Sequence, residues 1–251
     1  MTTYFNEIDP YPAGWLRGAF PGSMVDERSI TDVGAEDVAG AERAHFFAGI
    51  GGWELALDMA GWEPGRVVWT GSCPCQPFSV AGRGDGASDE RHLWPEFFRL
   101  IRECRPGVVF GEQVAGAIGF GWMDAVACDL ESLGYAFGAA VLGAHSVGAP
   151  HIRQRVYWVA STDASGKGGT RLVAGADIGS SRPWGVCGEA DMRSLIDAPF
   201  QRGDRWPKPL IRSVDDGVPG RVGKLRAAGN AIVPQVAAEF VRAYMETEAT
   251  T

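Results

Sequence analysis

Residues 44–60 read AHFFAGIGGWELALDMA, and this stretch decides the fold. The apolar run Ala44–Phe47 is typical of a buried strand, and Trp53–Ala60 carries apolar residues at helical spacing. Three glycines lie between them, where the missing Cβ lets the backbone approach a ligand. Strand, glycine turn and helix in this order predict a cofactor site at the carboxyl end of a parallel strand. The turn alone is a weak signal, because its spacing is not GxGxxG.

The rest of the chain repeats this alternation. Further runs typical of strands are Thr3–Phe5, Val67–Thr70, Val108–Phe110, Ala136–Leu142 and Val156–Ala160. Helical spacing recurs at Leu93–Cys104 and Met123–Leu133, and Pro234 is placed to open a C-terminal helix. The alternation predicts an α/β fold with a largely parallel sheet. From residue 162 to about 209 the pattern fails, which indicates an irregular inserted subdomain.

Composition limits the class of protein. A chain of 251 residues with 45% hydrophobic content predicts one main domain with a small appendage. The sequence has neither an apolar run of the ~18 residues that a membrane helix needs nor a signal pattern, so we expect a cytoplasmic protein. The five cysteines have no framework spacing and the four histidines form no cluster, so reduced thiols and no metal are expected.

Charge is distributed unevenly along the chain. The net charge of −8 argues against a general polyanion binder. Residues 161–226 nevertheless carry 11 Lys and Arg against 8 Asp and Glu. This excess permits a phosphate-facing surface in the second half of the chain, and an ordinary mixed surface is an equal alternative.

A second motif, GSCPCQPFS at residues 71–79, follows directly after the predicted strand Val67–Thr70. Cys75 lies there on a loop stiffened by two prolines and facing the same cleft as the glycine turn. This is the placement of a nucleophile. The alternatives are a buried structural cysteine, or a metal site shared with Cys73, for which further ligands are missing.

FAGIGG at residues 47–52 and PCQPFS at residues 74–79 resemble the S-adenosylmethionine-binding and nucleophile motifs of the DNA (cytosine-5)-methyltransferase family. Three later segments resemble further motifs of that family in the same order. Gly111–Val114 resembles its Glu-Asn-Val motif, with Gln113 in place of Asn. His151–Arg155 resembles Gln-x-Arg-x-Arg, with His151 in place of Gln, and Gly229–Ala231 resembles the C-terminal Gly-Asn-Ser/Ala motif.

The resemblance implies a circular permutation, similar to phage and prophage members. In the family, two strands that hold the adenosine separate the glycine and nucleophile motifs, but here Trp62 and Gly71 are nearly adjacent. Residues 4–11 and 25–33 resemble the two displaced motifs. We therefore expect a Rossmann-like methyltransferase sheet in residues 1–160, with residues 1–43 completing the cofactor site. Residues 161–220 would be a small irregular target-recognition insertion, and residues 221–251 would return to the catalytic domain.

The resemblance also implies a site and a mechanism. The expected catalytic residues are Cys75, Glu112, Arg153 and Arg155. In this reading the Cys75 thiolate adds to C6 of a flipped cytosine, Glu112 holds N3 and N4 of the base, and Arg155 holds O2. The expected cofactor-binding residues are Phe47, Ala48, Gly49, Ile50, Gly51, Gly52, Glu7, Ile8, Ser29, Ile30, Pro74, Asn230 and Ala231.

Within the cofactor site, Glu7 would accept hydrogen bonds from the ribose and Ile8 would cover one face of the adenine. Ser29 stands where the family has an adenine-contacting Asp. The resemblance therefore leaves that contact to the backbone of Ile30 or to Asp26.

The partner implied is double-stranded DNA, bound by a protein expected to act as a monomer. The expected DNA-contacting residues are Gln76, Ser79, Arg83 and Arg91, in a glycine-rich stretch that would close over a phosphate backbone or be a plain surface loop. Arginines of the insertion, such as 182, 202 and 205, would read a site of two to four base pairs. A tRNA cytosine-5 methyltransferase and a non-catalytic DNA-binding relative are the alternatives, and a paired restriction endonuclease is left open.

Overall fold

The computed structural model describes residues 2–74, 93–149, 151–162, 171–173 and 229–249. The chain divides into two units, residues 1–175 with 226–251, and residues 176–225. The second unit lies outside the described residues, and so does nearly all of the predicted insertion 161–220. Residues 75–92, with Cys75, lie outside them too. The fold described below is that of the first unit.

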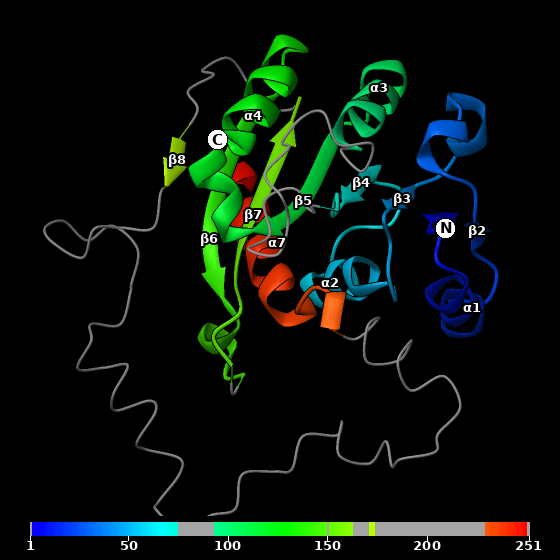
Figure 1. Ribbon diagram of the computed structural model, residues 1–251, viewed down its shortest axis with the longest axis horizontal. Helices are drawn as coiled ribbons and strands as arrows, with labels where there is room; N and C mark the ends of the chain where they lie inside the picture. The colour runs from blue at the N-terminus through cyan, green and yellow to red at the C-terminus, as the bar shows by residue number, and fades with distance from the viewer. Residues whose placement is uncertain (1, 75–92, 150, 163–170, 174–228, 250–251) are drawn as a thin grey trace, which may run out of the picture. The chain divides into compact units, whose positions relative to one another are not determined.

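A sheet of eight strands forms the centre of this unit, in the order β2-β1-β3-β4-β5-β7-β6-β8 (Figure 1). The strands are β1 Thr3–Asn6, β2 Met24–Asp26, β3 Arg43–Phe46, β4 Val68–Gly71, β5 Val108–Val114, β6 Ala136–Gly143, β7 Gln154–Ser161 and β8 Arg171–Val173. Strands β1 to β5 are parallel, and β7 is antiparallel to both of its neighbours. The predicted α/β fold with a largely parallel, Rossmann-like sheet is confirmed.

The first two strands of the chain complete the sheet beside the glycine turn. Strand β1 pairs with β3 from Thr3↔Arg43 to Asn6↔Phe46, and β2 lies on the far side of β1. If β3 is counted first, β1 second and β2 third, the order becomes 3-2-1-4-5, that of doubly wound nucleotide-binding sheets. The N-terminal strand β1 therefore lies beside the strand that ends at the glycine turn, the position that the permuted order predicts for it.

Helices and short 3₁₀ turns connect the strands. The helices are α1 Pro10–Ala19, α2 Gly52–Ala60, α3 Trp94–Cys104, α4 Trp122–Ser132 and α7 Pro234–Ala249. The 3₁₀ turns are Ile30–Asp32, Ala35–Val38, Ala115–Phe120 and Ala144–Val147. Gly61 (φ 77°) and Gly134 (φ 84°) follow α2 and α4 in the left-handed conformation, and Pro234 opens α7, as predicted. No helix of the described ranges is both long and apolar enough to cross a membrane.

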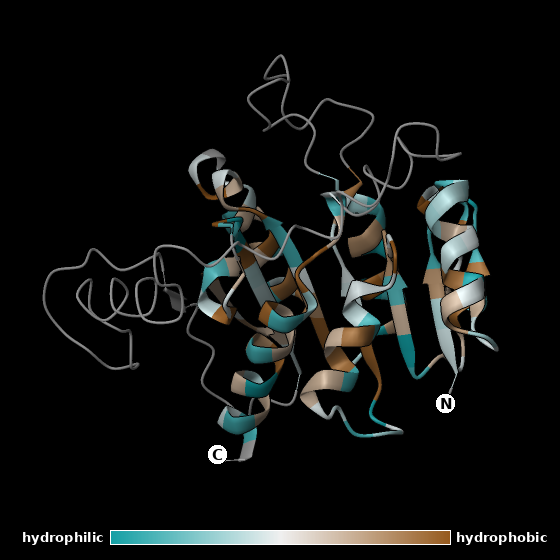
Figure 2. Ribbon diagram, turned by 90° about the horizontal axis from the view of Figure 1, so that it is seen from below, coloured by the Kyte–Doolittle hydropathy of each residue, from teal (hydrophilic) through white to brown (hydrophobic). Residues whose placement is uncertain are grey.

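Side chains that alternate along the central strands build a core on each face of the sheet. Tyr157 and Phe110 belong to a cluster that packs against α2 and α7. Their neighbours Trp158 and Val109 point the other way, into the cluster beneath α3 and α4. In Figure 2 the brown, hydrophobic residues gather on the strands between the helices, whereas the C-terminal helix has teal on its outer turns. The strands are held between two layers of helices, so their carboxyl ends are the edge at which loops meet.

Candidate active site

The glycine turn connects β3 to α2 with three residues in the left-handed region, namely Phe47 (φ 54°), Gly49 (φ 57°) and Gly51 (φ 83°). At Gly51 a Cβ would lie 2.3 Å from Cε2 of Phe20, so both packing and backbone conformation require glycine. At Gly49 a Cβ would meet nothing within 4 Å. The backbone of Gly49 thus borders open space, which a cofactor docking at this turn would need.

Glu7, just past the end of β1, reaches this turn. Its Oε2 atom accepts a hydrogen bond from the N–H of Gly49 over 2.7 Å, and its Oε1 atom accepts one from the N–H of Asp9 over 2.9 Å. Burial raises the pKa of Glu7 above its ordinary value, although both backbone N–H groups act to lower it. Each oxygen keeps a second lone pair that a ribose hydroxyl could use. The adjacent Ile8 side chain is 64% exposed, as expected of a residue that would cover an adenine.

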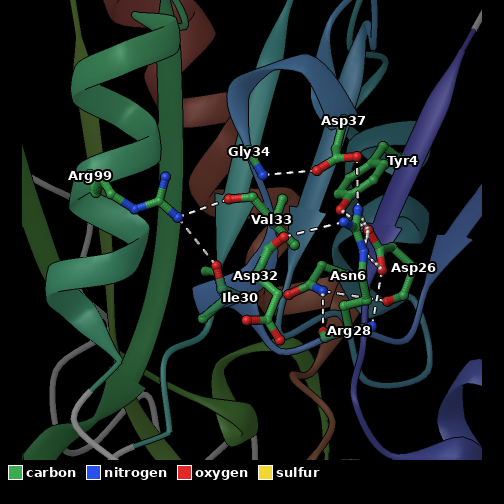
Figure 3. A network of polar contacts seen from close by, with 10 residues as sticks. All are labelled: Tyr4, Asn6, Asp26, Arg28, Ile30, Asp32, Val33, Gly34, Asp37 and Arg99. Carbon is green, nitrogen blue, oxygen red and sulfur yellow. Dashed lines mark hydrogen bonds and ion pairs between the residues drawn. The ribbon is translucent and has the colours of Figure 1, made fainter.

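An ion-pair network fixes the loop after β2 (Figure 3). Asp26 accepts from Arg28 Nη2 over 2.6 Å and from the Tyr4 hydroxyl over 2.9 Å. Arg28 also pairs with Asp37 over 2.8 Å, and Asn6 Nδ2 donates to the carbonyl of Arg28 over 2.9 Å. The hydrogen bond from Arg28 is the main reason that the pKa of Asp26 is lowered. The Asp26 carboxylate, one of the two candidates for the adenine contact, is therefore already engaged.

The other candidates lie in the same loop. Ser29 Oγ accepts from the hydroxyl of Thr31 over 2.8 Å and caps the short turn that begins at Ile30. The Ile30 side chain is buried in the core, and its carbonyl accepts from Val33 N over 3.3 Å and from Arg99 Nη2 over 3.4 Å. The buried Ile30 side chain is therefore unable to contact a cofactor, and only the backbone of Ile30 could do so.

The C-terminal motif lies against the glycine turn. A Cβ on Gly52 would come within 2.7 Å of Ile232 Cγ1, so the two segments touch. Arg153 holds the motif in place, because its Nη1 donates to Gly229 O over 2.9 Å and its Nη2 donates to Ala231 O over 2.7 Å. Burial lowers the pKa of Arg153, and nearby Arg155 adds to this effect. Arg153, predicted as a catalytic residue, is here a tie between the start of β7 and the C-terminal segment.

Glu112 and Arg155 face each other on the neighbouring strands β5 and β7. Arg155 Nε lies 2.9 Å from Glu112 Oε1 as an ion pair, yet this oxygen has no hydrogen-bond partner. Glu112 is only 8% exposed. Burial raises the pKa of Glu112 to about 7, whereas the charges of Arg155 and Arg153 act to lower it. A buried carboxyl with a raised pKa beside charged partners is typical of sites that bind a ligand.

Two hydrogen bonds hold the start of the loop that leads to Cys75. Gln113 Nε2 donates to the carbonyl of Cys73 over 3.1 Å, and Trp53 Nε1 donates to Ser72 Oγ over 3.1 Å. The sequence marks Gln113 only as a departure from a motif and gives no signal for Trp53.

Some predicted site residues cannot be placed. Pro74 is described and exposed, whereas Cys75, Gln76, Ser79, Arg83 and Arg91 lie outside the described residues. In the part of the chain that is described, no group of three or more His, Cys, Asp or Glu side chains could hold a metal ion.

Part of the chain is similar to known methyltransferases. Residues 67–168 match the family described as C-5 cytosine-specific DNA methylase. The chain is 27% identical over 169 residues to the type II methyltransferase M.HhaI of Haemophilus parahaemolyticus, covering 52% of each protein. It is 36% identical over 99 residues to M.NgoMIV of Neisseria gonorrhoeae, covering 38% of this chain and 32% of that protein. The chain thus spans about half, or less, of the length of these relatives.

Among solved structures, the methyltransferase EhMeth of Entamoeba histolytica is 14% identical and superposes with a TM-score of 0.46. The match covers 64% of this chain and 52% of that one.

Proposed function

We propose that the protein transfers a methyl group from S-adenosylmethionine to C5 of cytosine in DNA, in line with the match of residues 67–168 to the C-5 cytosine-specific DNA methylase family. The observation that carries this proposal is the buried Glu112 carboxyl, with its raised pKa and its ion pair to Arg155 on the neighbouring strand. It lies on β5, directly beside β4, whose end leads into the loop with Cys75.

Cys75 supplies the nucleophile in this proposal. Cytosine C5 is too weak a nucleophile to take a methyl group directly, so the thiolate first adds to C6 and makes C5 enamine-like. After methyl transfer, the C5 proton is lost and the Cys75–C6 bond breaks, which restores the aromatic ring and the thiolate. Bound S-adenosylmethionine supplies the electrophilic methyl group.

Glu112 then recognises and activates the base. With a pKa of about 7, its carboxyl is substantially protonated at neutral pH. The neutral acid donates to N3 of cytosine and accepts from the N4 amino group, and it stabilises the charge that develops at N3 when C6 is attacked. Arg155, already beside Glu112, contacts O2. Thymine presents a carbonyl in place of the amino group and is disfavoured.

The glycine turn and Glu7 hold the cofactor. Open space beside Gly49, the Glu7 oxygens and the exposed Ile8 side chain together fit an adenosine, with the ribose hydroxyls on the carboxylate and the adenine on the apolar side chain. The Gly229–Ala231 segment closes the site from the C-terminal side, because Arg153 holds it against the turn.

Duplex DNA is the proposed partner. A stacked base cannot reach a cysteine in a cleft, so it is flipped out at a cost of a few kcal/mol. The charge excess of residues 161–226 and the arginines of the 76–91 stretch support contact with phosphates, and the small size of the insertion favours a short recognition site.

The test is methyl transfer from labelled S-adenosylmethionine to duplex DNA, single-stranded DNA and tRNA, followed by nucleoside analysis. We expect 5-methylcytosine in duplex DNA, and none with Cys75→Ala. Transfer of the labelled methyl group to tRNA alone would show that the substrate is RNA. If no nucleic acid is labelled while the protein binds the cofactor, the proposed activity is wrong.

A further inference from the structure

Two side chains from different parts of the fold hold the residues that precede Cys75. Gln113 belongs to β5, the strand that carries Glu112, and it bonds the carbonyl of Cys73. Trp53 lies in the first turn of α2, directly after the glycine turn, and it bonds the hydroxyl of Ser72. The start of the nucleophile loop is thus attached on one side to the base-recognition strand and on the other side to the cofactor turn.

The Gln113 amide is fixed at both ends. Its Oε1 accepts from the N–H of Val114 over 2.9 Å, so its Nε2 is the end that faces the carbonyl of Cys73. The side chain is only 3% exposed, so water cannot readily replace the bond. The shorter Asn of the related motif lacks the methylene that gives Gln113 its reach.

The Trp53 ring is equally well held. It stacks on Phe110 with ring centroids 6.0 Å apart and meets Tyr157 edge-on at 6.1 Å, and it is only 4% exposed. This packing restrains the ring, whose N–H is directed at Ser72. A shift of the glycine turn would pass through Trp53 to the start of the nucleophile loop.

We propose that Gln113 and Trp53 are positioning residues, a two-point clamp that holds Ser72 and Cys73, just before the proposed nucleophile, and couples them to the glycine turn. Cys75 is two residues beyond Cys73, a reach of at most ~7 Å, and Pro74 between them restricts the backbone. Loss of the clamp is therefore expected to change the reactivity of Cys75. This inference rests on the proposed role of Cys75 as the nucleophile.

Two variants, each of which removes one hydrogen bond of the clamp, test it. Gln113→Glu keeps the acceptor for Val114 but replaces the donor that faces Cys73 with a carboxylate oxygen. Trp53→Phe keeps an aromatic ring but removes the N–H that reaches Ser72. We expect each to lower kcat by about 10- to 100-fold, because small misplacements of reacting groups have effects of this size. The KM for DNA and the Kd for S-adenosylmethionine should change less than about threefold, because the clamp contacts neither ligand.

Trp62→Phe is the matched control. Trp62 lies just past the opposite end of α2, is equally buried, and donates its N–H to the carbonyl of Arg66 over 3.0 Å. This variant also loses one indole hydrogen bond, but none to the nucleophile loop, so kcat should remain within about twofold of the wild type. Ser72→Ala should reproduce Trp53→Phe, and the double variant should be no slower than either single one, because all three lose the same bond.

Alkylation of Cys75, followed by peptide mass mapping, provides a readout that does not need methyl transfer. In the wild type, added S-adenosylmethionine should change the alkylation rate, and the clamp variants should lose that dependence, whereas Trp62→Phe should keep it. Clamp variants with wild-type kcat and wild-type alkylation would overturn the inference. If the wild type transfers no methyl group, the proposed function fails. The alkylation comparison then decides the clamp separately.

Discussion

The Glu7 carboxylate accepts a hydrogen bond from the backbone N–H of Gly49 over 2.7 Å, although the two residues are 42 positions apart. The contact connects the end of β1 with the turn after β3. It depends on the parallel pairing of the two strands, in which Asn6 lies opposite Phe46. The N-terminal segment therefore contacts the glycine turn, as the proposed permutation requires.

Glu7→Ala should weaken binding of S-adenosylmethionine by ~1–3 kcal/mol, the usual cost of leaving buried hydrogen-bonding groups unsatisfied. Isothermal titration calorimetry measures the change. Glu27→Ala is the control, because Glu27 is a carboxylate of the same N-terminal region whose ion pair with Arg17 is exposed, and its loss should leave the Kd unchanged. Equal affinities for the two variants would show that Glu7 does not hold the cofactor.

Glu112 makes the stability of the protein depend on pH. Its pKa rises from 4.5 to about 7 in the folded chain, so the folded state binds this proton more tightly than the unfolded state does. The stability contributed by the neutral carboxyl is complete below the unfolded pKa and is lost as the pH rises through about 7. Between these limits we expect the wild type to lose ~1–3 kcal/mol of unfolding free energy relative to Glu112→Gln. Urea titrations in which the unfolding free energies of the wild type and Glu112→Gln change equally with pH would contradict this expectation.

Glu54 should show the opposite dependence. It is buried between His45 Nε2, at 2.8 Å, and Arg43 Nη1, at 3.0 Å. Burial alone would raise the pKa of Glu54, but the bonds and charges of His45 and Arg43 hold it below its ordinary value. Its stabilising effect is thus present at neutral pH and is lost as the pH falls through the lowered pKa.

At neutral pH we expect Glu54→Gln to lower the free energy of unfolding by about 3 kcal/mol, because it removes the buried carboxylate that pairs with Arg43 and bonds His45. The deficit relative to the wild type should shrink as the pH falls through the lowered pKa of Glu54. A deficit that is the same at acidic and neutral pH would mean that the ionised carboxylate is not what stabilises this region.

Arg153→Leu should release the C-terminal segment from the catalytic core. Both hydrogen bonds to Gly229 and Ala231 are lost, which corresponds to ~1–3 kcal/mol of local stability. Amide hydrogen exchange should accelerate in residues 229–236, and it should accelerate less in β7. His151→Ala, a change at an exposed neighbour, serves as the control. Unchanged protection of the C-terminal segment would remove the tie that we assign to Arg153.

Local signals in the sequence predict β3, which leads into the glycine turn, β4, which leads toward Cys75, and β5. They also predict the ends of α2 and α4 at Gly61 and Gly134. They fail for α1, whose PYPAGWLRGA sequence has a high content of proline and glycine. This helix is stabilised by the Asp9 cap and by burial of Leu16 against the sheet. The antiparallel direction of β7 also has no local signal, because pairing with β5 and β6 determines it.

In the candidate site, too, some residues could be predicted from the sequence and others could not. Motif resemblance identifies Glu7, Glu112 and Arg155, which the fold brings to the carboxyl edge of the sheet or to neighbouring strands. The tie made by Arg153 and the clamp made by Gln113 and Trp53 depend on contacts between distant segments, for which a sequence motif carries no information. The expected roles of Arg83, Arg91 and the arginines at positions 182, 202 and 205 fall outside the described residues and stay predictions.

Covalent trapping tests the central claim, attack of Cys75 on C6 of cytosine, most directly. Duplex DNA containing 5-fluorocytosine in place of cytosine is incubated with the protein and S-adenosylmethionine, because fluorine cannot leave C5 as a proton does. We predict a denaturant-resistant adduct with the wild type that depends on the cofactor, maps to Cys75 by mass spectrometry and is absent with Cys75→Ala. Failure of the cofactor-bound wild type to form an adduct on DNA that it methylates when unmodified, or an adduct that persists in Cys75→Ala, would contradict the mechanism.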